Sequence, residues 1–265
     1  MRHGLFLPIF GELAEPALVA RLAAEAEAAG WDGVFVWDHV TYQEPVTDIA
    51  DPWITLAAMA CATSTVRIGP MITPLPRRRP VKVAREVASL DRLSGGRLTL
   101  GVGIGGDNSG EVSGCGEQPD ARVRAQMLDE ALEILAAAGS GAVLTHRGPH
   151  YVADGFAVLP RPVQPHVPVW VAARWGNPAP LRRAARHDGV FPIGLETPDQ
   201  LAELVATVNA QRPDTGPYDV AVRGPVDTDP RPWQASGATW WMTEFSPYTL
   251  TEVEVRAAVT AGPQR

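Results

Sequence analysis

The feature that most constrains this fold is a regular alternation of short, continuously apolar runs with longer amphipathic stretches. Continuous apolar runs, rather than alternating ones, indicate strands that are buried on both faces. The stretches between them have helical length and composition, as in the Ala- and Glu-rich segment 15–29, which ends at Gly30. Strands and helices in strict alternation predict parallel strands joined by right-handed crossovers.

The apolar runs predict eight strands, at 4–9, 34–37, 67–73, 98–102, 167–172, 189–193, 219–223 and 238–242. The stretches between and after them predict helices at 15–29, 52–62, 81–93, 123–138, 180–186, 199–211, 232–236 and 251–261. Eight such units in about 250 residues are typical of a (β/α)8 barrel of the TIM type. We therefore expect an α/β fold with one barrel domain over residues 1–265. A doubly wound sheet is the alternative, although it rarely needs eight units.

One stretch does not fit the alternation. Residues 139–167, before the fifth strand, are irregular and are expected to form a short insertion. It contains a predicted hairpin, because apolar runs at 143–145 and 151–158 flank Gly148-Pro149.

Composition excludes several classes of protein. The formal charge of −7 argues against a general binder of nucleic acid or of membrane surfaces. No apolar run approaches the length of a membrane span, no signal peptide fits the first residues, and Cys61 and Cys115 form no CxxC pair. A cytoplasmic protein with reduced thiols is the expectation. No metal site is expected either, because Gly148-Pro149 prevents the helix that would align His146 with His150.

The segment Gly101-Val102-Gly103-Ile104-Gly105-Gly106 matches the G-x-G-x-x-G fingerprint of dinucleotide-binding folds. That fingerprint requires a helix that opens on the last glycine, whereas the turn sequence Asp107-Asn108-Ser109-Gly110 follows here. The preferred interpretation is a strand end whose small residues let a flat ring lie against the backbone. A flexible loop without a ligand is the alternative.

Five ordered segments carry a family resemblance that runs nearly end to end. They are residues 30–39 (GWDGVFVWDH), 67–80 (RIGPMITPLPRRRP), 90–103 (LDRLSGGRLTLGVG), 128–133 (LDEALE), and 160–164 (PRPVQ) with 168–171 (PVWV). With these segments the chain resembles the bacterial-luciferase-like flavin-dependent oxidoreductases.

The resemblance implies a TIM-like barrel that binds FMN or the deazaflavin coenzyme F420 at its C-terminal mouth. It implies a bacterial enzyme that acts on a small organic molecule, either as a monooxygenase on reduced FMN or by hydride transfer with the deazaflavin. A separate flavin reductase and a homodimer are the possible protein partners. A flavin-binding barrel without turnover is the alternative function, since fold and chemistry are separable.

The resemblance also suggests where the chemistry lies. His39 ends the second strand, where an imidazole is suited to proton transfer. Its neighbour Asp38 either fixes the His39 tautomer or serves the barrel wall, and we prefer the structural role. For the third strand the family implies a non-proline cis peptide that supports the ring of the cofactor.

The predicted cofactor-binding residues all lie at strand ends. They are Pro70, Met71 and Thr73 in the third strand, Gly103, Gly105 and Asp107 at the fourth, Ala173, Arg174 and Trp175 at the fifth, and Gly194 at the sixth. The helix that follows Arg174 is expected to attract a phosphate through its free N–H groups, with Arg174 adding a bidentate contact.

Some residues depart from the family pattern. Deazaflavin-dependent dehydrogenases often have a Glu directly after the Gly-rich strand end, a place that Asp107 or Glu111 would have to fill here. They also often have a Trp after the histidine, where this chain has Tyr42 and Gln43. The run 77–79 (RRR) is interpreted as a solvated loop, and at least one of the two tryptophans at 240–241 as barrel core.

Overall fold

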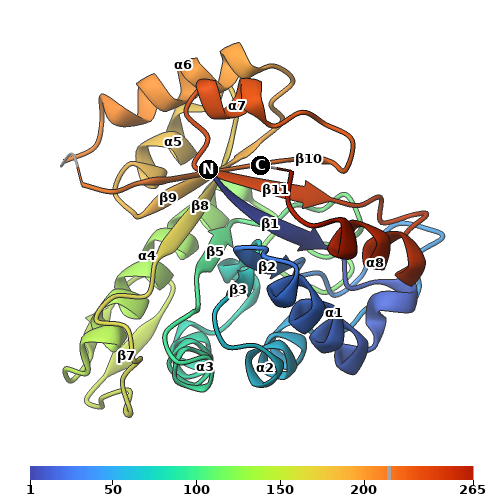
Figure 1. The fold of residues 1–265 in the computed structure, drawn as a ribbon. Helices are drawn as coiled ribbons and strands as arrows, with labels where there is room; N and C mark the ends of the chain where they lie inside the picture. Colours follow the sequence, from blue (N-terminus) through green and yellow to red (C-terminus); the bar gives the residue numbers. More distant parts are fainter. Residues whose placement is uncertain (214–215, 265) are drawn as a thin grey trace.

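The computed structural model describes residues 1–213 and 216–264 (Figure 1). The strands are β1 (Arg2–Leu7), β2 (Gly33–Val36), β3 (Arg67–Pro70), β4 (Thr73–Pro74), β5 (Leu100–Gly103), β6 (Thr145–Arg147), β7 (Val152–Asp154), β8 (Val169–Arg174), β9 (Gly189–Ile193), β10 (Asp219–Pro225) and β11 (Trp240–Glu244). The α-helices are α1 (Pro16–Ala28), α2 (Pro52–Ala62), α3 (Pro80–Leu93), α4 (Ala121–Ser140), α5 (Pro178–Ala184), α6 (Pro198–Asn209), α7 (Arg231–Ala235) and α8 (Glu252–Ala261). Two short 3-10 helices are η1 (Gly11–Ala14) and η2 (Leu75–Arg77).

All pairings in the main sheet are parallel, and its strand order is β3-β2-β1-β11-β10-β9-β8-β5-β4. The third strand of the barrel consists of two pieces, because β3 pairs with β2 whereas β4 pairs with β5. The Met71–Ile72 peptide bond between the two pieces is cis. A parallel bridge from Ile68 to Leu98 joins the two ends of the sheet. The result is a nearly closed barrel, which confirms the predicted fold class.

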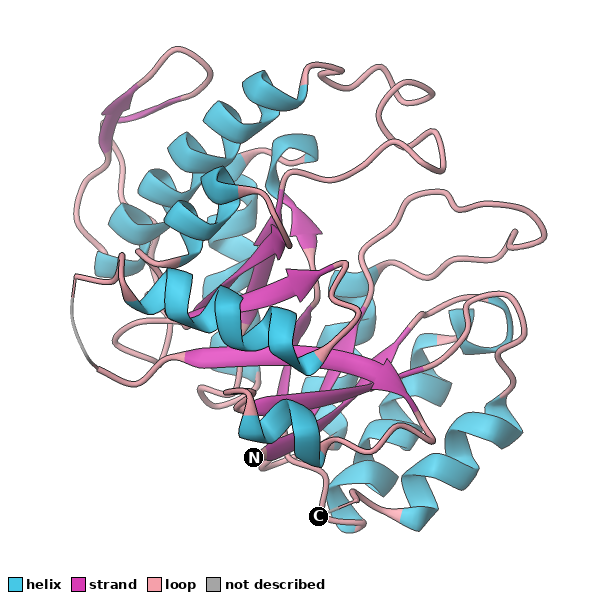
Figure 2. Cartoon of the chain, turned by 90° about the horizontal axis from the view of Figure 1, so that it is seen from above, coloured by secondary structure: helices cyan, strands magenta, loops and turns pink. Residues whose placement is uncertain are grey.

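The helices cover the outside of this barrel. Figure 1 shows α1, α2 and α3 in a row beside the first strands, with α5, α6 and α7 on the opposite side. Figure 2 shows the strands enclosed between these helices, with long loops at one end. Helix N-termini are capped as the sequence suggests, for example by the Asp51 carboxylate, which accepts the N–H of Ile54 in α2.

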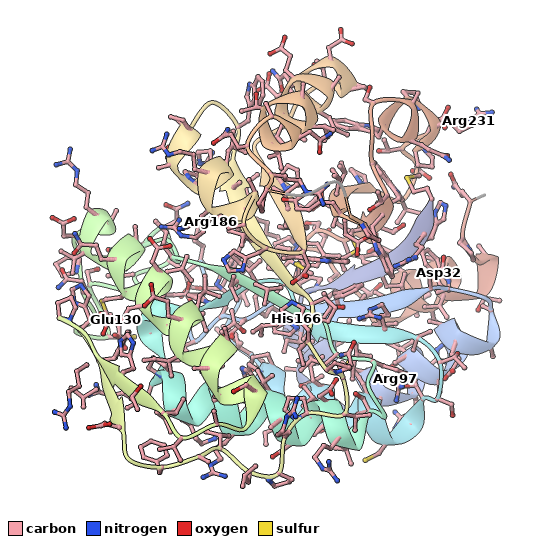
Figure 3. All side chains as sticks on the ribbon, turned by 90° about the vertical axis from the view of Figure 1, so that its left-hand side faces the viewer. Asp32, Arg97, Glu130, His166, Arg186 and Arg231 are labelled. Atoms are coloured by element: carbon pink, nitrogen blue, oxygen red, sulfur yellow. The ribbon has the colours of Figure 1, made fainter. Side chains whose placement is uncertain are left out.

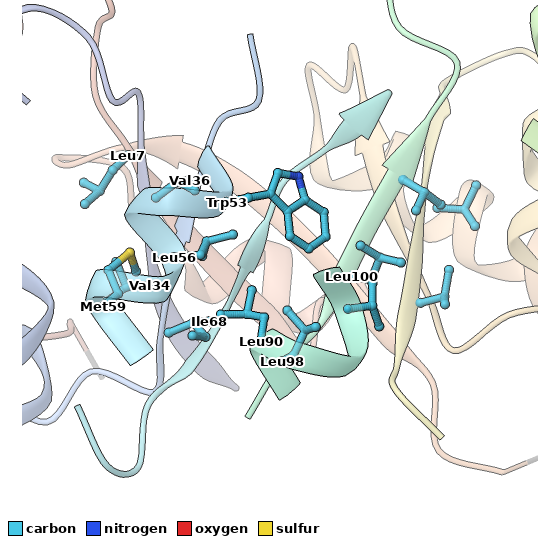
Figure 4. Close-up of a cluster of buried hydrophobic side chains, with 14 of the residues drawn as sticks. Leu7, Val34, Val36, Trp53, Leu56, Met59, Ile68, Leu90, Leu98 and Leu100 are labelled. Carbon is cyan, nitrogen blue, oxygen red and sulfur yellow. The ribbon is translucent and has the colours of Figure 1, made fainter. Parts of the chain in front are cut away.

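Two apolar clusters stabilise the barrel. The outer cluster lies between strands and helices, and Figure 4 shows the part formed by β1 to β5 with α2 and α3. The inner cluster fills the barrel and consists of Phe6, Phe35, Met71, Trp170, Phe191, Ala221, Trp240 and Met242. Trp240 has no exposed surface, and its ring lies 5.4 Å from that of Trp170. The expectation that one tryptophan of the last strand belongs to the barrel core is confirmed.

The insertion before β8 contains the predicted hairpin, formed by the antiparallel pair β6 and β7. Its strands are shorter than predicted, because Gly155 adopts a positive φ of 82° directly after β7. Glu130 of α4 anchors the hairpin by accepting the N–H groups of His150 and Tyr151 and by contacting His146 Nε2 at 2.8 Å (Figure 3).

The most specific sequence segment, 90–103, serves the scaffold. Its buried Arg97 donates to the carbonyl oxygens of Ala60, Thr63, Val66 and Ser94 and to the Thr63 hydroxyl. These bonds satisfy carbonyl groups at the end of α2 that would otherwise be buried without partners. Arg97 therefore fixes α2 to the strand that leads to the barrel mouth.

Candidate active site

The carboxyl ends of the parallel strands meet at one end of the barrel, which we call the mouth. Trp37, Ile72 and Ile193 pack on the inner cluster from this end and are partly exposed, whereas Phe6 and Phe191 beneath them are buried. The indole nitrogen Nε1 of Trp37 is buried and has no hydrogen-bond partner in the described part of the chain. An apolar floor with an unpaired polar atom has the character of a ligand site.

His39 lies in the loop after β2 and is held by a carboxylate. Its Nδ1 is 2.9 Å from Oε2 of Glu111, which comes from the loop after β5. The His39 side chain is 27% exposed, and among residues 1–213 and 216–264 its Nε2 has no hydrogen-bond partner. An ionised carboxylate only accepts, so Nδ1 carries the proton and Nε2 presents its lone pair.

Three groups keep Glu111 ionised. Burial raises the pKa of this carboxyl, but the hydrogen bond and charge of His39, the N–H of Val40 and the Arg77 guanidinium together hold the pKa below its ordinary value. Arg77 Nη1 lies 2.9 Å from Glu111 Oε1, and the Val40 nitrogen lies at the same distance from this oxygen. Glu111 thus has a fixed position and a stable charge, as a group that orients a histidine requires.

Asp38 has the structural role that the sequence favoured. Its carboxylate is buried, accepts the Thr73 hydroxyl at 2.8 Å, and forms ion pairs with Arg77 and Arg78. The His39 ring hydrogen-bonds to Glu111 rather than to this carboxylate, so Glu111 sets its tautomer.

The interpretation of the arginine run as a solvated loop is wrong for its first two members. The side chains of Arg77 and Arg78 are only 6% and 20% exposed. The buried carboxylates of Asp38 and Glu111 explain this, because each needs a cationic partner. Arg79 is exposed, as expected.

The predicted third-strand residues lie beneath the mouth surface. Pro70, Met71 and Thr73 are all buried, and the Thr73 hydroxyl donates its hydrogen bond to the Asp38 carboxylate. Ile72, which the sequence reasoning passed over, is the residue of this segment that is partly exposed. Ile72 is therefore the side chain of this segment that a ligand could reach, and its buried neighbours support it from below.

Two glycines, at the end of β5 and just after it, let neighbouring side chains lie close to the backbone. A Cβ at Gly103 would lie 2.3 Å from Ile72 Cδ1 and 3.4 Å from Ala172 Cβ. Gly105 adopts a positive φ of 72°, and a Cβ there would lie 3.0 Å from Pro74. The absence of a Cβ therefore serves the packing of Ile72 and Pro74, and a flat ring against this strand end stays a prediction.

Asp107 organises the loop that carries Glu111. Its Oδ1 accepts the N–H groups of Val112 and Ser113 at 2.9 and 3.0 Å. The next helix begins only at Ala121, so the G-x-G-x-x-G segment lacks the helix that a dinucleotide site requires, as predicted. A direct contact of Asp107 with a cofactor stays a prediction.

The segment after β8 differs from the prediction in two ways. Ala173 has no exposed surface and belongs to the outer cluster, so Ala172 is the alanine at the mouth. The helix α5 has no free N–H in its first three residues, because Pro178 and Pro180 lack one and Ala179 donates to Asn177. The predicted attraction of a phosphate by this helix is therefore wrong.

Arg174 keeps its expected position as a cation at the mouth. It is exposed, and in the described part of the chain its guanidinium has no hydrogen-bond or ion-pair partner. Its Nη1 lies 3.2 Å from the place that a Gly194 Cβ would take, so it extends over the end of β9. Trp175 is partly buried, and its backbone N–H is used by the Ile193 carbonyl.

Other features of the described residues do not compete with this site. Within residues 1–213 and 216–264, no group of three or more His, Cys, Asp or Glu side chains is arranged to hold a metal ion. No helix in these residues has the length and apolar character needed to cross a membrane. A small cavity of about 160 Å³, lined in part by His166, His187 and Asp188, lies at the opposite end, where the strands begin.

Comparisons with known proteins agree with this geometry. A model of the luciferase-like monooxygenase family matches residues 1–261. An uncharacterized protein of Mycobacterium tuberculosis (strain ATCC 25618 / H37Rv) is 31% identical over 222 residues, which cover 76% of this chain and 74% of the relative. An F420-dependent glucose-6-phosphate dehydrogenase of Kineococcus radiotolerans is 33% identical over 178 residues, which cover 64% of this chain and 50% of the relative.

Solved structures show the same fold at low sequence identity. An F420-dependent secondary alcohol dehydrogenase in complex with an F420–acetone adduct gives a TM-score of 0.81 at 19% identity, with 98% of this chain and 96% of that chain covered. A monooxygenase from Streptomyces bottropensis gives a TM-score of 0.78 at 21% identity, again with 98% and 96% covered.

Proposed function

The chain belongs to the luciferase-like monooxygenase family, and from this membership we propose an oxidoreductase that binds F420 or FMN at the barrel mouth and uses His39 to move a proton at the substrate. Three observations support binding at the mouth. Gly103 lets the partly exposed Ile72 lie close to the strand end, Trp37 Nε1 is buried without a partner in the described residues, and Arg174 is a cation with no partner there.

Each of these groups suits one part of such a cofactor. The apolar floor formed by Trp37, Ile72 and Ile193 fits a flat ring, and Arg174 fits a phosphate, which planar guanidinium groups bind well. The guanidinium would have to bind it without help from α5, whose first N–H groups are absent or used.

We propose hydride transfer with F420 as the reaction. When bound, oxidised F420 would supply the hydride acceptor for the C–H hydrogen of an alcohol. His39 Nε2 would accept the O–H proton, and the product would be a carbonyl compound with reduced cofactor. The reverse reaction uses the same groups.

The observation that carries this proposal is the His39–Glu111 pair at 2.9 Å. With Nδ1 bound to an ionised carboxylate, Nε2 accepts a proton from the substrate, and the nearby negative charge stabilises the imidazolium that forms. The F420 dependence of the Kineococcus radiotolerans relative also supports this choice of cofactor.

A monooxygenase that uses reduced FMN is the second candidate, because the matched family carries that activity in its description. Anaerobic turnover separates the two. Alcohol-dependent loss of the F420 absorbance without oxygen supports hydride transfer, whereas product formation that requires both oxygen and reduced FMN supports the monooxygenase. Cofactor binding without either reaction, across broad substrate panels, would leave a flavin-binding barrel without turnover.

A further inference from the structure

A cluster of aromatic rings surrounds His39 and forms one side of the mouth. We call this set the aromatic wall; it consists of Phe10, Trp37, His39, Tyr42 and Tyr248. The Tyr42 ring lies 4.9 Å from Phe10, 5.0 Å from His39 and 5.9 Å from Tyr248. Its members come from the loops after β1, β2 and β11, so three separate segments converge on the histidine.

The outer edge of the wall is tied to the loop that carries Glu111. The Tyr248 hydroxyl donates to Gln43 Oε1 at 2.6 Å, and Gln43 Nε2 donates to the Asn108 carbonyl at 3.1 Å. The wall is thus fixed by hydrogen bonds at the rim and by ring packing near His39. Such a wall offers ring faces and edges to a bound molecule.

The positive charges beside the wall are already neutralised. Arg77 is paired with Glu111, Arg78 with Asp38, and Arg223 with Glu244. Arg223 lies near the wall, because its guanidinium is 5.9 Å from the ring centre of Phe6, which packs on Trp37 at 5.3 Å. An anionic group on the substrate would have to displace one of these carboxylates or stay unpaired.

The Tyr42 hydroxyl stays protonated and neutral. Burial, with the neighbouring Tyr248 hydroxyl, raises the pKa of Tyr42 to about 12. The wall therefore presents hydroxyl and imidazole groups without an unpaired charge.

We propose that the partly exposed face of the aromatic wall binds a neutral, ring-containing alcohol or its ketone, and rejects sugar phosphates and other anionic substrates. This rests on the proposed function, since it names the substrate class for the reaction at His39. The ring of the substrate packs on Tyr42 and Trp37, and its oxygen meets His39 Nε2. The unpaired Arg174, on the side of β8 and β9, is left for the phosphate of the cofactor.

The test measures binding and turnover separately, with 1-phenylethanol and glucose 6-phosphate as probes. Calorimetric titration of the protein with each probe gives the dissociation constant of that probe, and both titrations are repeated in the presence of F420. We expect 1-phenylethanol to bind at least tenfold more tightly than glucose 6-phosphate, a difference of about 1.4 kcal/mol. Tighter binding of glucose 6-phosphate, or equal binding of both, would overturn the proposal.

Two variants locate the preference. Tyr42→Ala removes a ring of the wall and should weaken 1-phenylethanol binding about tenfold, whereas Phe156→Ala, which removes an exposed ring on the distant insertion, should leave it unchanged. Unchanged binding in a folded Tyr42→Ala protein would contradict the assigned place.

Turnover tests the underlying reaction independently. Preferential binding of 1-phenylethanol without cofactor reduction would uphold the substrate class and refute the hydride transfer. Turnover of glucose 6-phosphate in preference to 1-phenylethanol would refute the substrate class and uphold the hydride transfer.

Discussion

Nδ1 of His39 lies 2.9 Å from Oε2 of Glu111, although 72 residues separate the two in the sequence. The loop after β2 and the loop after β5 meet in this contact. This contact gives the partly exposed imidazole a defined tautomer, with its proton on Nδ1. Nε2 is left as the nitrogen that a substrate can approach.

Replacement of the histidine should remove proton transfer and spare the cofactor. His39→Ala is expected to lower kcat by about 10²- to 10⁴-fold, the range of general acid–base catalysis. The dissociation constant for F420 should change little, because binding is assigned to Gly103 and Arg174. Stopped-flow measurement of cofactor reduction checks the rate, and full turnover in this variant would exclude His39 from the mechanism.

Glu111→Gln should lower kcat less than His39→Ala does, since the amide keeps the shape but loses the charge that stabilises the imidazolium. In the wild-type protein the pKa of Glu111 is lowered, so its carboxylate is present above the ordinary value of 4.5 and is lost only as the pH falls through the lowered pKa. A kcat–pH profile measures this. An identical profile in wild type and Glu111→Gln would refute the positioning role.

The role of Gly103 in placing Ile72 at the mouth can be tested with a matched pair of alanine substitutions. A Cβ at Gly103 would lie 2.3 Å from Ile72 Cδ1 and force that side chain to move, whereas a Cβ at Gly106 has no heavy atom within 4 Å. We expect Gly103→Ala to fold but to bind F420 at least about tenfold more weakly, a loss of about 1.4 kcal/mol. Gly106→Ala should bind as wild type does. Equal binding by the two variants would place the ring elsewhere.

Arg174 is expected to bind the phosphate of the cofactor. Loss of a hydrogen bond to a charged group costs about 1.5–3 kcal/mol, so Arg174→Ala should weaken F420 binding by roughly tenfold to over a hundredfold. Arg182→Ala is the control, because Arg182 is an exposed arginine of the adjacent helix α5. The dissociation constant for F420 should depend on the salt concentration. A weaker salt dependence in Arg174→Ala, with an unchanged one in Arg182→Ala, would support the assignment. Similar effects of both would contradict it.

The pH dependence of stability should carry a contribution from the other end of the barrel. The hydrogen bond that His166 Nε2 donates to Asp188 Oδ2 at 2.7 Å raises the pKa of His166, so the stabilisation from this pair is present below the unfolded pKa and is lost as the pH rises through the folded value. Because the His166 side chain is 64% exposed, the effect should be at most about 0.5 kcal/mol. Urea unfolding of wild type and His166→Gln from about pH 6 to about pH 9 measures it.

The control is the same substitution in an Asp188→Asn background, where the pH dependence should disappear. His187 provides the opposite sign, since burial lowers its pKa and stability is lost as the pH falls. A difference between wild type and His166→Gln that grows with rising pH would contradict the pairing.

The sequence predicted the barrel well, because its strands are buried on both faces and their apolar runs are unmistakable. It predicted the position of His39 and the structural role of Asp38 for the same reason, since both directly follow a strand. It was less successful where the outcome depends on which face of a strand a residue occupies. Ala172 and Ile72 are the residues at the mouth, one position before Ala173 and Thr73 respectively, because strand side chains alternate between faces.

The buried arginines were missed because a run of three arginines resembles a solvated loop. The signal that would have located Arg77 and Arg78 is the pair of carboxylates at Asp38 and Glu111, which a barrel brings to the same end. That proximity depends on the path of the 104–120 loop, which no local pattern determines. The two prolines that disable α5 as a phosphate site were visible in the sequence and outweigh the general preference of helix N-termini for anions.

The most direct test of the central claim is anaerobic fluorescence titration of the wild-type protein, Gly103→Ala and Gly106→Ala with F420 and with FMN. Wild type and Gly106→Ala are expected to bind one of the two cofactors with a dissociation constant of about 10 μM or less, near −7 kcal/mol, and Gly103→Ala is expected to bind it at least about tenfold more weakly. Absence of binding of either cofactor to the wild-type protein, or equal binding by all three proteins, would contradict the assignment of the barrel mouth as a flavin or deazaflavin site.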